Sequence, residues 1–165
     1  FFEDNDISSL FANLNGVDFS NAFFGEQRPF SNDGINFYGA QLNDSKFVNA
    51  QLSDAHLCSA QLNRADFSNA QLQGANLQNA QLNEACFDGA QLDGTVFSDR
   101  TQLEGASFEN VKLESGSSIK IGSKTTKNRN KITQWFENKG ATISFVEPQS
   151  KERNWERLVR KLILK

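Results

Sequence analysis

Large apolar residues recur at every fifth position along most of the chain, and a small apolar residue stands two positions before most of them. Residues 49–92 read NAQLSDAHLCSAQLNRADFSNAQLQGANLQNAQLNEACFDGAQL. An α-helix repeats at about 3.6 residues and a strand at 2, so a period of five matches neither. The period therefore predicts a repeated unit that joins a short extended segment to a change of direction.

Sixteen Leu or Phe residues mark the centres of this repeat. Eleven of them have Ala two positions earlier, and the other five have Ile35, Ser45, Thr95, Thr101 or Val111 there. The spacing changes once, by one extra residue between Phe97 and Leu103. The centres are Phe37, Leu42, Phe47, Leu52, Leu57, Leu62, Phe67, Leu72, Leu77, Leu82, Phe87, Leu92, Phe97, Leu103, Phe108 and Leu113.

A small and a large apolar residue two positions apart face the same side when the segment between them is extended. The two polar residues that follow break the alternation, so the chain must turn a corner there. Short sides joined by corners wind the chain around an axis and fill its interior with Ala, Leu and Phe. Such coils are stable only when they stack on one another, as in other repeat proteins.

The motif A-[DN]-[LF]-x-x resembles that of the pentapeptide repeat family, and it occurs literally in ADFSN (65–69) and ANLQN (75–79). The resemblance runs from residue 35 to residue 113. It implies an all-β solenoid, a right-handed quadrilateral β-helix with about 20 residues in each coil. Many repeats have Gln at the middle position, where the family favours Asp or Asn.

With four repeats in each coil, every fourth centre falls in one inward column. Phe47, Phe67, Phe87 and Phe108 then form a column of Phe alone, between two columns of Leu. The middle-position glutamines form two outward columns, whose stacked amides are expected to hydrogen-bond along the rod.

The repeat pattern divides the chain into three parts. Residues 1–11 are expected to cap the first coil, because an open end exposes a pairing edge. Residues 12–122 are predicted to form the solenoid, with an excursion at 25–34, where a proline cannot join a ladder, and the insertion at 98–102. Residues 123–165 are predicted to be a basic, α-helical capping segment.

Two helices are predicted in the carboxyl-terminal part. Residues 125–140 place Ile132, Trp135 and Phe136 on one face. Residues 150–165 carry a stronger apolar stripe, which we predict covers the end of the last coil in one cluster with Trp135. A second copy of the protein or a membrane would be the alternative cover. The stripe consists of Trp155, Leu158, Val159, Leu162 and Ile163.

The net charge of −3 conceals an uneven distribution. Residues 1–111 contain 15 acidic and 4 basic side chains, and residues 112–165 contain 5 acidic and 13 basic ones. The register also predicts an acidic stripe on or beside the Phe side of the rod, suited to a basic partner. The stripe comprises Asp44, Asp66, Glu84, Asp88, Glu104 and Glu109.

The residues give little support to catalysis. His56 is the only histidine and is expected to face solvent, so a histidine-based triad or zinc site lacks its parts. Cys58 and Cys86 are predicted on opposite sides of the rod as free thiols, which favours a reducing compartment. Carboxylates on a convex rod diverge. We therefore expect no enzyme activity, no cofactor and no metal.

The localisation stays open, with a slight preference for the cytoplasm. The chain starts at Phe1 and contains no Met, so its true start is not visible, and the earlier removal of an amino-terminal targeting segment stays open.

A non-enzymatic scaffold that presents a surface to another protein is the favoured function. The protein is expected to be a monomer, with a homodimer through one end or through the carboxyl-terminal helix as the alternative. Because some members of the family resemble duplex DNA, a DNA-mimicking regulator of DNA gyrase or topoisomerase is the second hypothesis. The third is membrane-surface association through the basic helix, which we regard as less favoured. Direct nucleic-acid binding is not expected.

Overall fold

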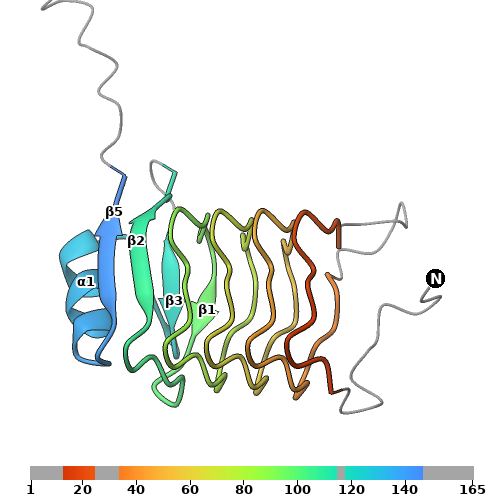
Figure 1. Ribbon diagram of the computed structural model, residues 1–165. Coiled ribbons are helices and arrows are strands. Elements are labelled where there is room, and N and C mark those ends of the chain that lie inside the picture. Colours follow the sequence, from red (N-terminus) through yellow and green to blue (C-terminus); the bar gives the residue numbers. More distant parts are fainter. Residues whose placement is uncertain (1–12, 25–33, 115–117, 147–165) are drawn as a thin grey trace, which may run out of the picture.

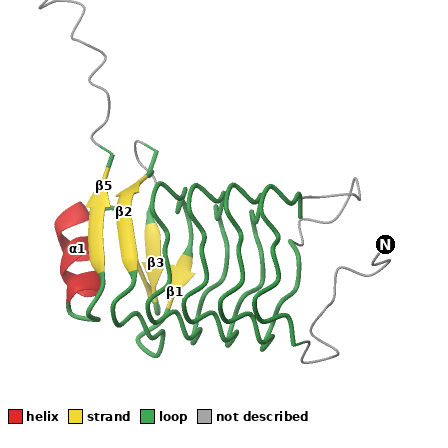
Figure 2. Cartoon of the chain, viewed as in Figure 1, coloured by secondary structure: helices red, strands yellow, loops and turns green. Residues whose placement is uncertain are grey.

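The computed structural model describes residues 13–24, 34–114 and 118–146, which form a rod of stacked coils (Figure 1). Parallel β-bridges join residues 20 positions apart through the middle of the rod, as in Asn36 to His56 and Gln41 to Gln61. Bridges recur every five residues along the chain, so each coil contains four repeats. Most are isolated bridges, and within the described residues regular strands are confined to the part from Val96 to Phe145 (Figure 2).

Changes in the bridge offset locate the two irregularities. The first coil pairs with an offset of 28, as in Asp18 to Lys46, so the chain makes an eight-residue excursion between Phe24 and residue 34. After the insertion the offset rises from 20 to 21, as in Gln81 to Gln102.

Most corners of the described coils are β-turns whose third residue has a positive φ, and the insertion corner at 98–101 is an exception. In the turn after Leu42, the amide N–H of Ser45 donates to the carbonyl of Leu42 at 3.3 Å, and Asp44 has φ of 60°. Asn, Asp and Gly tolerate this left-handed conformation best, which explains why they are frequent at the second corner position. Arg64 and Glu84 adopt it as well, with φ of 58° and 59°.

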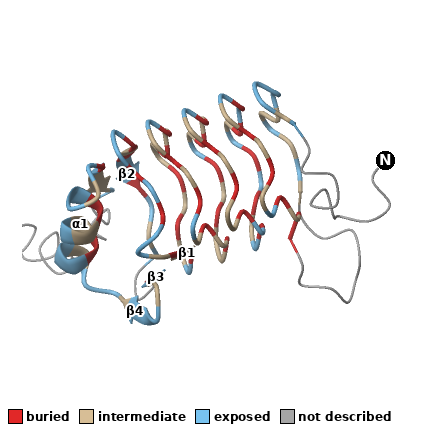
Figure 3. Ribbon diagram, turned by 90° about the horizontal axis from the view of Figure 1, so that it is seen from below, coloured by how far each residue is buried: buried red, intermediate tan, exposed pale blue. Residues whose placement is uncertain are grey.

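The interior is filled by the Ala, Leu and Phe positions (Figure 3), and Phe47, Phe67 and Phe87 are fully buried. The rings of the Phe column lie nearly parallel. Their centroids are 4.9 Å apart between Phe47 and Phe67, 4.7 Å between Phe67 and Phe87, and 4.5 Å between Phe87 and Phe108. Phe19 of the first coil extends the stack, 5.1 Å from Phe47.

Three polar residues occupy Ala positions without leaving a buried polar group unpaired. The hydroxyl of Ser45 donates to the carbonyl of Leu42 at 2.6 Å, and that of Thr95 donates to the carbonyl of Leu72 at 2.9 Å. The hydroxyl of Thr101 donates to the carbonyl of Leu77 at 3.1 Å. A buried hydroxyl with such a partner avoids the cost of desolvating an unpaired group.

The carboxyl-terminal end combines short strands with one helix. β1 (Val96–Phe97) pairs in parallel with β3 (Ile119–Ile121), which forms an antiparallel hairpin with β4 (Lys124–Thr126). β2 (Ser107–Val111) pairs in parallel with β5 (Thr142–Phe145). α1 (Arg129–Glu137) lies between β4 and β5 in sequence and crosses the end of the rod (Figure 1).

The short helix was predicted, but the segment expected to be α-helical also contains the strands β4 and β5. Gly122, with φ of 58°, turns the chain back so that the β-branched Thr125 and Thr126 pair with β3. The boundary expected after residue 122 therefore falls inside this turn. Asn128 caps α1 through a hydrogen bond to the amide of Lys131 at 3.2 Å.

α1 covers the end of the Phe column. Phe136 is fully buried and meets Phe108 edge-on, with centroids 4.6 Å apart, and it lies 5.2 Å from Phe97. Ile132 is fully buried on the same face of the helix. Trp135 packs against Phe97 at 5.9 Å. The other predicted cap residues, Trp155, Leu158, Val159, Leu162 and Ile163, lie outside the described residues, as does the predicted cap at 1–11.

Gly34 closes the excursion against the backbone of the next coil. A Cβ at this position would stand 2.4 Å from the carbonyl carbon and 2.5 Å from the carbonyl oxygen of Asp54. Because backbone cannot yield cheaply, we expect Gly34→Ala to lower the free energy of unfolding by about 1–3 kcal/mol in urea denaturation. If the variant were as stable as the wild type, the backbone at Gly34 and at Asp54 would have room to move apart and accept the added Cβ.

Candidate interaction surface

The six acidic residues of the predicted stripe occupy three kinds of position in the repeat. Asp66 is a middle residue, bridged to Lys46 and Cys86 on either side. Asp44 and Glu84 are second corner residues with positive φ. The first corner position, directly after a buried Leu or Phe, holds Asp88, Glu104 and Glu109.

One basic residue interrupts the acidic corner column. Arg64 lies between Asp44 and Glu84 and makes two hydrogen bonds to Asp44, from Nε to Oδ1 and from Nη2 to Oδ2, each 2.7 Å long. Hydrogen bonds from Arg64 lower the pKa of Asp44 below its ordinary value, and the same contact raises the pKa of Arg64. Both side chains are about half exposed. This part of the stripe is therefore largely neutralised.

Two of the aspartates are engaged by the solenoid itself. Oδ1 of Asp66 accepts hydrogen bonds from the amide and the hydroxyl of Ser68. Oδ1 of Asp88 accepts from the hydroxyl of Ser107 at 2.5 Å and from the amide of Glu109 at 2.9 Å. These carboxylates hold their own corner and the adjacent coil in place, and both residues are only partly exposed.

Glu104 and Glu109 lie where the last coils meet the cap. The hydroxyl of Ser144 in β5 donates to Oε2 of Glu109 at 2.8 Å. The carboxylate of Glu104 occupies the space into which a side chain at Gly140 would project, which explains the glycine there. Both glutamates are exposed, as is Glu84. These three residues form the outward acidic charge that remains, and we call them the acidic surface.

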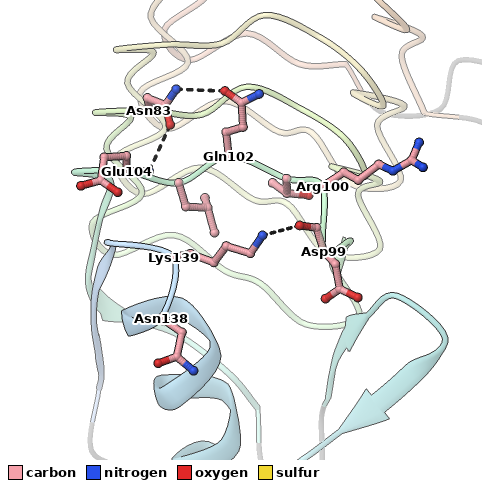
Figure 4. Close-up of a pocket in the computed structure, with 9 residues that line it drawn as sticks. Asn83, Asp99, Arg100, Gln102, Glu104, Asn138 and Lys139 are labelled. Carbon is pink, nitrogen blue, oxygen red and sulfur yellow. Dashed lines mark hydrogen bonds between the residues drawn. The ribbon is translucent and has the colours of Figure 1, made fainter.

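A polar groove of about 520 Å³ borders the acidic surface between the insertion and the end of α1 (Figure 4). Lys139 reaches across it to donate to the backbone carbonyl of Asp99. On its other side Nδ2 of Asn83 donates to Oε1 of Gln102 at 3.2 Å. The extra residue at 98–102 thus pushes the corner outward to meet the cap. The open groove and its mixed charges suit contact with another macromolecule better than capture of a small substrate.

The sequence interpretation missed a ladder of asparagines at the first corner position. Oδ1 of each asparagine accepts a hydrogen bond from the backbone N–H of the equivalent residue in the next coil. Oδ1 of Asn15 accepts from Asn43 at 2.8 Å, Oδ1 of Asn43 from Asn63 at 3.0 Å, and Oδ1 of Asn63 from Asn83 at 3.1 Å. Oδ1 of Asn83 accepts from the amide of Glu104 in the same way. The signal for this ladder in the sequence is an Asn directly after each of four stacked Leu residues.

Cys58 and Cys86 are free thiols, as predicted. Within residues 13–24, 34–114 and 118–146, no group of three His, Cys, Asp or Glu side chains is placed to hold a metal ion. None of the helices in that part of the chain is long and apolar enough to cross a membrane.

Comparison with known proteins gives the class to which this rod belongs. The family model described as pentapeptide repeats matches residues 35–70 and 60–99, in eight copies. The chain is a pentapeptide repeat protein, as its motif indicated. No curated protein matches the sequence.

Solved structures to which the chain is similar include those of three proteins. A pentapeptide repeat protein from the thylakoid lumen of Arabidopsis thaliana is 24% identical, covers 70% of this chain and 84% of its own, and has a TM-score of 0.51. One from Nostoc PCC 7120 is 24% identical over 77% and 84%, with a TM-score of 0.38. QnrB1, a plasmid-mediated fluoroquinolone resistance protein, is 17% identical over 79% and 86%, with a TM-score of 0.27. The Arabidopsis structure supports a shared right-handed β-helix solenoid.

Proposed function

We propose that this protein is a right-handed, four-sided rod that acts as a non-enzymatic scaffold and presents its acidic surface to a basic protein. The observation that carries this proposal is the fixed placement of Glu84, Glu104 and Glu109, exposed on a frame whose neighbouring coils are bonded to each other at each corner. A rigid acidic face steers a basic partner without paying the entropy of ordering loops.

The test compares two matched pairs of charge reversals. Glu84→Lys with Glu104→Lys alters the acidic surface, whereas Asp54→Lys with Glu114→Lys alters the same two corner positions on another side of the rod. Affinity isolation from the source cells should retain a basic protein on the wild type and on the control pair. We expect the acidic-surface pair to lose it, with Kd raised about tenfold or more for the purified partner.

Retention of the same proteins by both variant pairs would refute the acidic surface as the binding face. A supercoiling assay with purified DNA gyrase tests the DNA-mimicking hypothesis directly. The structure adds no observation that favours that hypothesis over a general protein scaffold. Thermal unfolding of each variant checks that the exposed substitutions leave the fold intact.

A further inference from the structure

The carboxyl-terminal cap is a basic surface at the end of an acidic rod. Residues 118–146 contain six basic side chains and one acidic side chain, whereas residues 34–114 contain ten acidic and four basic ones. Lys120, Lys124, Lys127 and Lys131 are all exposed. The cap therefore differs in charge from the rod, and the segment 13–24, drawn in red, lies at the end opposite α1 (Figure 1).

A groove of about 270 Å³ opens in this cap between the β3–β4 hairpin and α1. Ile121 and Trp135, both half-buried, supply apolar lining. Lys124 and Lys131 stand at its rim, one on the hairpin and one on the helix. The carboxylate of Asp99, which also lines the groove, accepts a hydrogen bond from Nε1 of Trp135 at 3.4 Å. An apolar recess flanked by lysines suits an acidic segment that carries a large apolar side chain.

We propose that this groove binds the amino-terminal segment, residues 1–12, of a second copy of the chain. That segment, FFEDNDISSLFA, has three acidic side chains, no basic one, and three phenylalanines. β4 is the edge strand of the three-stranded sheet, so an extended segment can also pair beside the groove. The result is a head-to-tail contact, which extends into a chain of rods because its two surfaces differ.

Charge distinguishes this occupant from the other segments of the same protein that could enter the groove. Residues 147–165 contain six basic and three acidic side chains, so the lysines at the groove disfavour them. Residues 1–12 of the same copy would have to run back along coils that are themselves acidic. Residues 1–12 of a second copy bring acidic charge to the lysines of the groove and do not have to run along acidic coils to reach it. This contact does not depend on the acidic surface and its proposed partner.

The proposal is tested by sedimentation velocity of the full chain over a concentration series, at low and at high salt. We expect association that grows with concentration at low salt and weakens at high salt, because screening shortens the reach of the charges. Lys124→Glu with Lys131→Glu should raise the association Kd about tenfold or more, while Lys112→Glu, an exposed lysine on a repeat coil, should leave it unchanged.

A charge exchange identifies the occupant. A chain with Glu3→Lys, Asp4→Lys and Asp6→Lys should not self-associate, but it should pair with the Lys124→Glu, Lys131→Glu chain when the two are mixed. A wild type that remains monomeric at every concentration and salt would overturn the proposal. So would equal weakening by Lys112→Glu, or a mixture that fails to associate although both chains melt like the wild type.

Discussion

Replacing Phe67 by Ala is expected to lower the free energy of unfolding by about 3–5 kcal/mol. Phe67 is fully buried, with Phe47 stacked on one side at 4.9 Å and Phe87 on the other at 4.7 Å. The cavity left by the ring cannot collapse, because the spacing of the coils is fixed by backbone hydrogen bonds above and below it, such as Phe67 N to Cys86 O at 2.7 Å. Urea denaturation followed by circular dichroism measures the loss.

Gln71→Ala in the same coil is the control. Gln71 is a middle residue that faces outward, and its replacement should cost less than about 1 kcal/mol. Equal destabilisation by the two substitutions would show that the inward and outward positions are wrongly assigned. A small loss for both would show that the coils can slide or repack around a missing ring.

The interior of the rod could be predicted from the sequence because a single requirement acts on every coil. An inward position must be apolar and of fixed size, so the Ala and Leu or Phe columns are visible as a period of five. The insertion before Leu103 was visible for the same reason: one extra residue displaces all later centres. The winding and the inward positions therefore followed from spacing, whereas four repeats in each coil and the right-handed sense were implied by the resemblance to the pentapeptide repeat family.

The outward positions were less predictable, because several types of polar residue are compatible with exposure to solvent and with hydrogen bonding at the same position. The glutamine columns were expected to bond along the rod from one glutamine to the next, but Gln81 and Gln102 instead accept from corner asparagines of the preceding coil, as from Asn63 Nδ2 to Gln81 Oε1 at 3.5 Å. The shorter Asn side chain reaches the corner amide of the next coil instead, as from Asn83 N to Asn63 Oδ1. Sequence alone could not show that Asp66 accepts hydrogen bonds within its own corner and Asp88 from the next coil, while the side chain of Glu84 is exposed.

The cap was only partly predictable, because it occurs once and has no period. The spacing of Ile132 and Phe136 identified the helix and its buried face. The turn at Gly122 that creates β4 had no such signal, since it depends on pairing with β3. The capping role was predicted for residues 123–165, and within the described part of that segment α1 places Phe136 over Phe108. Residues 150–165 lie outside the described residues.

Replacing Phe136 by Ala is therefore expected to open the carboxyl-terminal end of the rod. Phe136 is the side chain that closes the Phe column and also touches Phe97, so its loss should lower the free energy of unfolding by about 3–5 kcal/mol. The faces of Phe108 and Phe97 would then meet water together and form an apolar patch at the end of the rod. Denaturation in urea and sedimentation velocity measure the two effects.

Gln134→Ala on the exposed side of α1 is the matched control and should leave both measurements unchanged, because Ala is a better helix former than Gln and no buried contact is lost. The association of the Phe136→Ala chain should persist at high salt, since it is driven by apolar burial rather than by charge. That persistence distinguishes it from the salt-sensitive contact at Lys124 and Lys131. If Phe136→Ala were as stable as Gln134→Ala, α1 would be an appendage on the last coil and the end of the Phe column would need another cover.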